Sequence, residues 1–172
     1  MPVGFGLEVE MNWTEGECQG QVPERRSGHS FTCAPAASGE PDERSAVLFG
    51  GKAVRTSGGP ALTNDLYSMD VNTFECTKHS FSAGPEPRAK HTATVVAPGK
   101  VCVFGGGSLT ARLNDCWVLD TESMSWSPAY DADTADVPAP RSGHAACFMD
   151  GKLYIISHQG HYELSAAWQW AL

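Results

Sequence analysis

Short runs of apolar, β-branched or small residues alternate with clusters of turn-forming residues along most of the chain. Residues 29–33 and 91–96 are two such runs, and residues 66–70 alternate between two unlike sets of side chains. A period of two is typical of a strand with two different faces. The dipeptides Pro98-Gly99 and Asp150-Gly151 each precede a further apolar run and indicate tight hairpin turns. Because no run has helical spacing, the pattern predicts roughly four short antiparallel strands in every ~50 residues.

Three phrases recur in a fixed order along the chain. The first is Arg-x-x-His, found at Arg26/His29, Arg88/His91 and Arg141/His144. The second is an apolar run that ends in Gly-Gly, found at Gly50-Gly51 and Gly105-Gly106. The third is Asn-Asp followed by an alternating run that closes on Asp, found at residues 64–70 and 114–120. Matched phrases at a spacing of about 50 residues predict a repeat protein in which each unit is one supersecondary element.

These phrases resemble the kelch repeat family of β-propellers, and the likeness covers roughly residues 23–157. The resemblance implies an all-β fold of four-stranded antiparallel blades in an incomplete ring. It divides the chain into an N-terminal segment 1–22, a first repeat 23–80, a second repeat 85–130 and a partial third repeat 138–172. The N-terminal segment is expected to carry an outer strand of a preceding blade at residues 11–14. The third repeat is degenerate, since Ser157-His158 stands where the others have Gly-Gly and no Asn-Asp follows.

Several motif residues are predicted to be architectural. Glycine at the end of a strand permits backbone turns that other residues resist and leaves room for the next strand, so both Gly-Gly pairs are assigned to the blade and not to a phosphate loop. Trp126, on an outer strand, is expected to pack against the neighbouring blade, while its counterpart Cys76 is far smaller. The carboxylates are expected to cap turns, a role assigned to Asp65, Asp70, Asp115 and Asp120.

The histidines invite a metal hypothesis. His29, His91 and His144 occupy equivalent places in successive repeats, and each is predicted to be a structural histidine bonded to a neighbouring group. His158 and His161 have ligand-like spacing, but no second pair of ligands lies near them in the sequence. No catalytic, cofactor or metal site is therefore predicted, and no cofactor is expected.

Charge and cysteine content narrow the class of partner. The chain has 12 basic and 20 acidic residues, a net charge of −8, so neither nucleic acid nor an anionic membrane is an expected partner. No run reaches the ~18 apolar residues of a membrane helix. The start of the chain lacks the basic region of a secretory signal.

The six cysteines form no Cys-x-x-Cys, and most lie in apolar runs. This pattern predicts buried reduced thiols and a cytoplasmic protein, with a nuclear location left open.

The repeat count leaves the ring unfinished. Two full blades and part of a third cannot close a propeller, which typically has about 4–8 blades. Either the chain is a fragment of a longer kelch protein or it completes its ring with another chain, including a second copy. In both cases the end blades should expose apolar faces, because each blade buries its faces against its neighbours.

The leading functional hypothesis is a non-enzymatic protein-interaction module that binds through loops on a rigid scaffold. The loops at residues 52–63 and 107–113 are expected to bring Arg55 and Arg112 to one face. By resemblance to some family members, the motif arginines Arg26, Arg88 and Arg141 lie on the binding rim and grip an acidic peptide. The alternative role for these arginines is to tie neighbouring blades together through ion pairs.

Two other functions remain open at this point. Kelch-like propellers include copper radical oxidases and iron-dependent specifier proteins, although the tyrosines of this chain and the missing Glu-x3-Asp-x3-Cys/His phrase do not match their sites. A third hypothesis is that the chain is one arc of a multidomain scaffold with no activity of its own.

Overall fold

The structure is a computed structural model that describes residues 15–35, 44–54, 59–130, 137–158 and 164–171. Every regular element in these ranges is a β-strand, so the predicted all-β class is confirmed. Within the described ranges no helix is long and apolar enough to span a bilayer.

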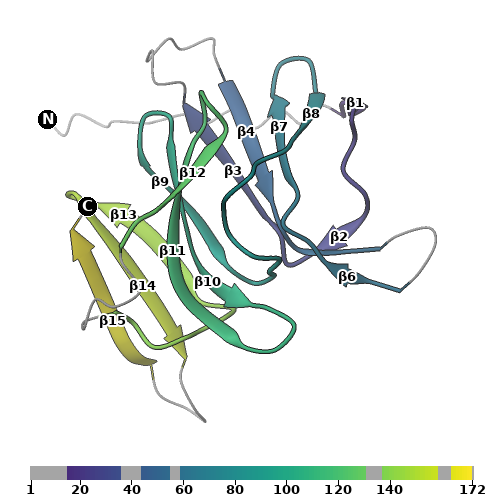
Figure 1. Ribbon diagram of the computed structural model, residues 1–172. Helices are drawn as coiled ribbons and strands as arrows, with labels where there is room; N and C mark the ends of the chain where they lie inside the picture. Colours follow the sequence, from purple (N-terminus) through teal and green to yellow (C-terminus); the bar gives the residue numbers. More distant parts are fainter. Residues whose placement is uncertain (1–14, 36–43, 55–58, 131–136, 159–163, 172) are drawn as a thin grey trace, which may run out of the picture.

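The strands form three successive blades (Figure 1). Blade 1 consists of β3 (Ser30–Pro35), β4 (Arg44–Phe49), β7 (Leu66–Asp70) and β8 (Glu75–His79). Blade 2 consists of β9 (Thr92–Ala97), β10 (Lys100–Gly107), β11 (Arg112–Asp120) and β12 (Ser125–Pro128). Blade 3 consists of β13 (Ala145–Met149), β14 (Lys152–His158) and β15 (Leu164–Ala171). All neighbouring strands within a blade are antiparallel.

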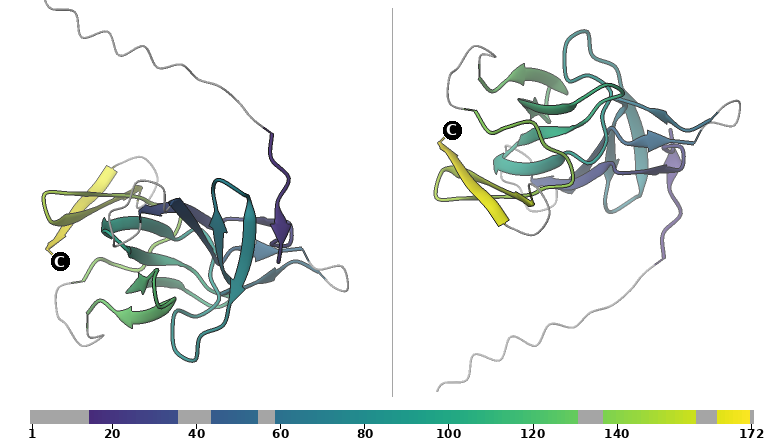
Figure 2. Two further views of the ribbon diagram at one scale, coloured as in Figure 1. Left: turned by 90° about the horizontal axis from the view of Figure 1, so that it is seen from above. Right: turned by 90° about the horizontal axis from the view of Figure 1, so that it is seen from below.

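The blades fan from their first strands. β9 lies in contact with β3 on one side and with β13 on the other, so the first strand of each blade is the innermost. Seen from above and below, β15 and β1 (Gln19–Gly20) lie on opposite flanks (Figure 2). In the described part of the chain no strand joins these two flanks, and the arc is open.

The turns follow the sequence prediction. Asp150 and Gly151 both have positive φ, 51° and 72°, in the two-residue loop between β13 and β14. That is the left-handed geometry which matches the twist of a hairpin. Asp70 and Asp120 cap turns as expected, each accepting two backbone N–H bonds from the residues that follow its strand, at 2.8–3.0 Å.

The described part of the N-terminal segment forms a short strand that the sequence did not predict. The strand predicted at residues 11–14 lies outside the described residues. The described part forms β1, which pairs in parallel with β8 and extends blade 1 by a fifth strand. A short ribbon of β2 (Arg26–Ser27), β5 (Lys52–Ala53) and β6 (Ala61–Leu62) lies beyond the end of blade 1.

Two hydrophobic clusters fill the junctions between blades. The first, between blades 1 and 2, joins Val47, Phe49 and Leu66 to Val101, Val103, Leu119 and Trp126. The second, between blades 2 and 3, joins Cys102, Phe104 and Cys116 to Leu153 and Ile155. Odd and even positions of each strand thus serve opposite neighbours, as alternation of side chains along a strand requires.

Among the described residues no blade covers the outer faces of blades 1 and 3. On blade 1, Cys18 and Pro23 of the N-terminal segment lie beside Tyr67 and Cys76, which are buried, and the rest of the face is open. Phe31 is 50% exposed on blade 1, and Met149 and Ile156 are 57% and 43% exposed on blade 3. The prediction of buried cysteines is wrong for half of them: Cys18, Cys33 and Cys147 are exposed, and only Cys76, Cys102 and Cys116 are buried. Cys33 and Cys147 occupy the uncovered faces, which explains why apolar sequence context misjudged their burial. All six thiols are free.

A pair of substitutions on blade 1 tests which face is a core. Phe49→Ala should lower the free energy of unfolding by about 3–4 kcal/mol, because it empties the centre of the first cluster. Phe31→Ala, on the opposite face, should cost about 1 kcal/mol or less. Urea unfolding followed by tryptophan fluorescence measures both. Equal losses would show that both faces of blade 1 are packed.

Candidate functional site

Arg88, the motif arginine of the second repeat, forms hydrogen bonds with two blades, one set through its backbone and the other through its guanidinium group. Its backbone is hydrogen-bonded to blade 1. The Arg88 N–H donates to Thr63 O at 3.2 Å, and the Gly51 N–H donates to Arg88 O at 2.7 Å. Its guanidinium group is hydrogen-bonded to blade 2, where Nη1 donates to Gly105 O at 3.0 Å. Arg88 therefore joins the two blades. Its link to blade 1 consists of backbone hydrogen bonds, and its link to blade 2 includes an ion pair.

The ion pair is with Asp115. The two guanidinium nitrogens donate to the two carboxylate oxygens at 2.6 and 2.7 Å, a bidentate geometry. The Arg88 side chain is fully buried, while that of Asp115 is 39% exposed. The indole N–H of Trp117 also donates to Asp115 at 2.8 Å. The turn-capping role predicted for Asp115 is therefore wrong, because its oxygens are occupied by Arg88 and Trp117.

Asp65 repeats this arrangement in blade 1 and equally does not act as the predicted turn cap. Its carboxylate accepts from Arg26 at 3.3 Å and pairs with Lys78 at 2.8 Å. Arg26 also donates to Gly50 O at 3.1 Å. Burial raises the pKa of Asp65, but hydrogen bonds from Lys78 and Thr63 and the charges of Lys78 and Arg26 outweigh it and hold the pKa below its usual value.

The backbone of Arg141 forms the equivalent two hydrogen bonds at the junction of blades 2 and 3. Its N–H donates to Leu113 O, and the Gly106 N–H donates to Arg141 O, both at 2.9 Å. In all three arginines Nε donates to the carbonyl two residues earlier, at 3.0–3.1 Å. The Arg141 side chain is buried as well. The three side chains are thus enclosed within the blades, and none extends into solvent.

The Gly-Gly pairs are required by the approach of this arginine backbone. Gly50 and Gly51 have φ of 65° and 95°, and a Cβ on Gly50 would lie 2.8 Å from Arg88 O. Gly105 and Gly106 repeat both features at the next junction, where a Cβ on Gly105 would lie 3.0 Å from Arg141 O. A side chain at these positions would push the next blade away.

The repeated histidines bridge blades. His91 Nε2 lies 2.8 Å from the Ser30 hydroxyl, and its ring meets Phe49 edge-on at 5.3 Å between centroids. His144 repeats both contacts with Thr92, at 2.9 Å, and with Phe104, at 5.3 Å. Burial lowers the pKa of His91 to about 3 and that of His144 to about 4, with the neighbouring motif arginine as the next cause. Both rings are therefore neutral at pH 7.

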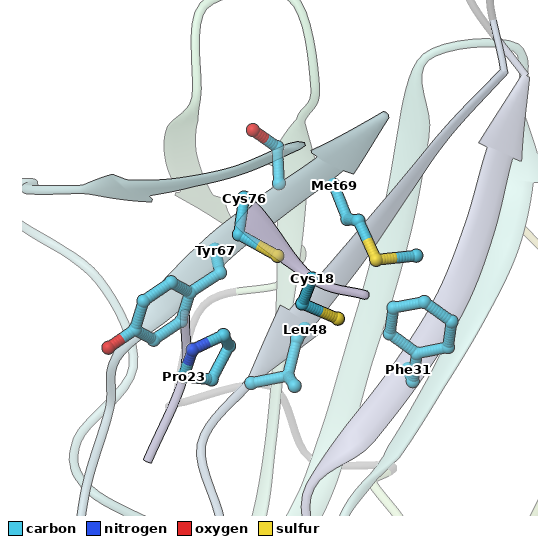
Figure 3. Close-up of a pocket in the computed structure, with 8 residues that line it drawn as sticks. Cys18, Pro23, Phe31, Leu48, Tyr67, Met69 and Cys76 are labelled. Carbon is cyan, nitrogen blue, oxygen red and sulfur yellow. The ribbon is translucent and has the colours of Figure 1, made fainter. Parts of the chain in front are cut away.

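Trp126 lies on β12 and packs against Phe49 of blade 1 at 4.9 Å between ring centroids. Its counterpart in blade 1, Cys76, leaves the equivalent space unfilled. A pocket of about 220 Å³ opens there, lined by Cys18, Pro23, Phe31, Leu48, Tyr67, Ser68, Met69 and Cys76 (Figure 3). Burial, followed by the adjacent Cys18 thiol, raises the pKa of the Cys76 thiol.

Cations gather at the end of the blades where the inner loops meet. The Lys90 N–H donates to Gly28 O at 2.7 Å, and the Gly143 N–H donates to Lys90 O at 2.8 Å, so three equivalent loop residues are linked in a row. Lys90 has φ of 59° where its equivalents Gly28 and Gly143 have 66° and 68°. A non-glycine residue in the left-handed region is strained by about 1–2 kcal/mol. Lys90 is exposed. Sequence reasoning missed it; the signal was a lysine in the Gly position of the Arg-x-Gly-His phrase.

The strand register brings further exposed residues to the same end. Ala89 pairs with Gly107, which pairs with Arg112. Lys52 pairs with Ser27, next to Gly28. Arg112 and Lys52 are exposed, and so are the apolar Val54 and Leu109, at 54% and 86%. We refer to Lys52, Val54, Lys90, Leu109 and Arg112 as the loop rim. Arg55, the other predicted rim cation, lies outside the described residues.

Comparison with known proteins agrees with the repeat geometry. The family model described as KLHDC2/KLHL20/DRC7 Kelch-repeats domain matches residues 7–172. The chain belongs to the kelch-repeat family. The kelch resemblance inferred from the arginine, glycine and Asn-Asp phrases is therefore confirmed.

The similar proteins are much longer than this kelch chain. It is 32% identical over 146 residues to acyl-CoA-binding domain-containing protein 5 of Arabidopsis thaliana, covering 84% of the chain and 20% of the relative. It is 33% identical over 162 residues to human host cell factor 2, covering 82% and 19%. It is 32% identical over 151 residues to the flagellar outer-arm dynein alpha chain of Chlamydomonas reinhardtii, covering 86% and 3%. The chain thus spans a fifth or less of these relatives.

Metal-binding geometry is not found in the described part of this kelch chain, where no three His, Cys, Asp or Glu side chains gather as a ligand set. The Sγ atoms of Cys102 and Cys116 lie 2.8 Å apart in the second core cluster. Their contact and their burial raise the pKa of the Cys116 thiol.

Removing the carboxylate partner of Arg88 tests the buried ion pair. Asp115→Ala should lower the free energy of unfolding by about 2–4 kcal/mol, because it leaves a buried guanidinium without its counter-charge. The matched change Asp65→Ala also removes the counter-charge of a buried guanidinium, but Arg26 holds Asp65 through a single contact of 3.3 Å, so the loss should be smaller, about 1–2 kcal/mol. Urea unfolding at pH 7 provides both values. A loss at Asp115 no larger than that at Asp65 would contradict the assigned role.

The bridging histidines predict acid sensitivity. Their folded pKa values lie below the unfolded value of about 6.5, so the unfolded chain binds more protons below that pH. Stability should therefore be complete above pH 6.5 and fall as the pH drops towards 4, by on the order of 1–2 kcal/mol per histidine. The expected measurement is urea unfolding between pH 7.5 and 4.5, a range above the titration of most carboxylates.

The control is His91→Gln, which keeps a polar group near the Ser30 hydroxyl and removes the titration. This variant should show a shallower loss of stability on acidification. The same slope as in the parent chain would rule out His91 as a source of the acid sensitivity.

Proposed function

We propose that this chain is a non-enzymatic protein-interaction module which meets its partner at the loop rim. Kelch-repeat membership and the relatives, which include host cell factors, support the coarse class of interaction module. The observation that carries the finer proposal is the chemistry of the rim: exposed cations and apolar side chains on loops anchored by buried strands.

The rim has the composition of an interface. Leu109, in the loop between β10 and β11, and Val54, directly after β5, are exposed apolar side chains that a partner could cover. Lys52, Lys90 and Arg112 are the cations of the loop rim, in a chain whose net charge is −8. A concentration of cations on an acidic protein favours a partner segment that carries carboxylates. We infer that the partner is an acidic, partly apolar peptide segment of another protein.

The strain at Lys90 supports a binding role. Its equivalents in blades 1 and 3 are glycines, which adopt a positive φ without cost. A lysine there weakens the fold slightly and adds a cation next to the axis. The motif arginines contribute to this function indirectly in our proposal: Arg26, Arg88 and Arg141 hold the loops, while Arg112, with Arg55, contacts the partner.

The chain is further proposed to be one arc of a larger ring in a longer protein, supported by the uncovered faces of blades 1 and 3 and by the small share of its relatives that it spans. A cytoplasmic location stays a prediction. No observation here favours the copper- or iron-dependent alternatives as a second candidate.

Lys90→Gly separates binding from stability. It should raise the free energy of unfolding by about 0.5–1 kcal/mol by relieving the left-handed strain. It should also weaken binding of a fluorescein-labelled hexaglutamate peptide by roughly two- to fivefold at low salt, the range of an exposed charge pair. Fluorescence anisotropy and thermal unfolding of the same samples measure the two effects.

Arg112→Gln should weaken the same peptide similarly, with no change in stability. Lys100→Gln is the control, since Lys100 pairs with Asp120 at the opposite end of β10 from the rim. Binding that survives the rim changes, or that falls equally with Lys100→Gln, would contradict a rim site. A hexalysine peptide should not bind.

A further inference from the structure

Two cysteines of blade 2 face each other across neighbouring strands. Cys102 lies on β10 and Cys116 on β11. Cys102 pairs with Val118, and Cys116 pairs with Phe104, so the two cysteines are diagonal neighbours on one face of the blade. Their Sγ atoms lie 2.8 Å apart. Since a disulfide bond is about 2.0 Å long, the two sulfurs need to approach each other by less than ~1 Å to form one.

The pair lies on the face of blade 2 that packs against blade 3. The second cluster joins the two cysteines and Phe104 to Leu153 and Ile155 of β14. The side chains of Cys102 and Cys116 are buried, with exposed fractions of 1% and 2%. Because blade 3 covers them, neither an oxidant nor a thiol reductant reaches the sulfurs while this junction is closed.

Packing also keeps the pair in its protonated, unreactive form. Contact with the Cys102 thiol, followed by burial, raises the pKa of the Cys116 thiol. The thiolate is the form of cysteine that attacks an oxidant, so a raised pKa slows the reaction. The burial that contributes to this effect ends when blade 3 leaves the face.

Blade 3 is the part of the arc that can open this junction. It stands at the end of the arc, and in the described residues no blade packs on its outer face, where Met149 and Ile156 are exposed (Figure 1). Blade 2, by contrast, is packed on both faces. A terminal unit with contacts on one side has a lower free energy of opening than a unit held on both sides. Opening of blade 3 therefore exposes the two sulfurs while blades 1 and 2 stay together.

We propose that Cys102 and Cys116 are an oxidation site that blade 3 controls: a peroxide converts the pair to a disulfide when blade 3 opens, and blade 3 then encloses the bond. One thiolate attacks the O–O bond of hydrogen peroxide, which gives a sulfenic acid and releases hydroxide. The second thiol displaces the sulfenic oxygen, which leaves as water, and the S–S bond forms. The two thiols together lose two electrons and two protons, and the peroxide becomes two molecules of water.

The disulfide ties the base of a loop that carries part of the loop rim. The chain between Cys102 and Cys116 includes Leu109 and Arg112, both exposed. Closing this loop covalently reduces the conformational freedom of the unfolded chain, so the oxidised protein should have a higher urea midpoint than the reduced protein. This consequence does not depend on what the loop rim binds.

Oxidation of the full chain by peroxide tests the proposal. The reduced chain and its variants are treated with hydrogen peroxide at pH 7 and then unfolded in a maleimide, and linked peptides are measured by mass spectrometry. Leu153→Ala weakens the second cluster, and Leu66→Ala is the matched control because Leu66 is equally buried in the first cluster. The Cys102–Cys116 link should form roughly tenfold or more faster in Leu153→Ala than in the parent chain or in Leu66→Ala, since only the first cavity loosens the blade 3 junction.

A second measurement follows the enclosed bond. The oxidised chains are prepared by refolding from urea in hydrogen peroxide, and dithiothreitol is then added. Reduction of the link should be roughly tenfold or more slower in the parent chain than in Leu153→Ala, for the same reason. Ile155→Val, a milder change in the same cluster, should give intermediate rates in both experiments, and it replaces Leu153→Ala if that variant does not fold. Oxidation of the exposed Cys33 should proceed at one rate in every chain and serves as the reference.

Three results would overturn the proposal. If refolding in peroxide leaves Cys102 and Cys116 as thiols, or oxidises each singly, the strand geometry does not allow the disulfide. If the link forms equally fast in Leu153→Ala and Leu66→Ala, oxidation follows unfolding of the whole chain and blade 3 does not control it. If the folded parent chain forms the link as fast as Leu153→Ala, blade 3 does not protect the pair.

Discussion

The arc is held together at each junction by a single arginine that belongs to two blades. The N–H and C=O of Arg88 and Arg141 bond to the preceding blade. The guanidinium groups of Arg26 and Arg88 bond to a carbonyl and an aspartate of their own blade. Because the backbone cannot approach so closely past a side chain, the Gly-Gly pair is required on the other side. The histidine three residues later then meets a hydroxyl and a phenylalanine of the preceding blade. The arginine, glycine and histidine motifs, which lie apart in the sequence, thus meet at the same junction between two blades.

This organisation gives the chain two kinds of surface. Faces between blades are apolar and tightly packed around Phe49 and Phe104. Faces at the ends of the arc have the same alternation of side chains but, in the described residues, no neighbouring blade. The exposure of Phe31 and Ile156 follows from position in the arc, since their equivalents in blade 2, Ala93 and Phe104, pack in the two clusters between blades. The rim lies at a third place, where the loops leave the blades.

The strands, the hairpins and the repeat order could all be predicted from the sequence because they follow from local patterns. Alternation at residues 66–70 and the turn at Asp150-Gly151 depend on neighbouring residues only. The partners of the motif side chains could not be predicted in this way. Asp115 looks like a turn cap until the fold brings Arg88 to it, and the hydroxyl of Ser30 has no role until the next blade places His91 beside it. Likewise, Cys33 lies in an apolar run but is exposed, because burial depends on a neighbouring blade.

The central claim is that the arginine and glycine backbone contacts hold the blades together, and amide hydrogen exchange of the 172-residue chain tests it most directly. The amides of Gly51, Arg88, Gly106 and Arg141, all donors across a junction, should exchange as slowly as those at the centre of β10. If these four amides exchange as fast as the exposed turn at Glu122 and Ser123 while the blade interiors stay protected, the blades fold separately and the account is wrong.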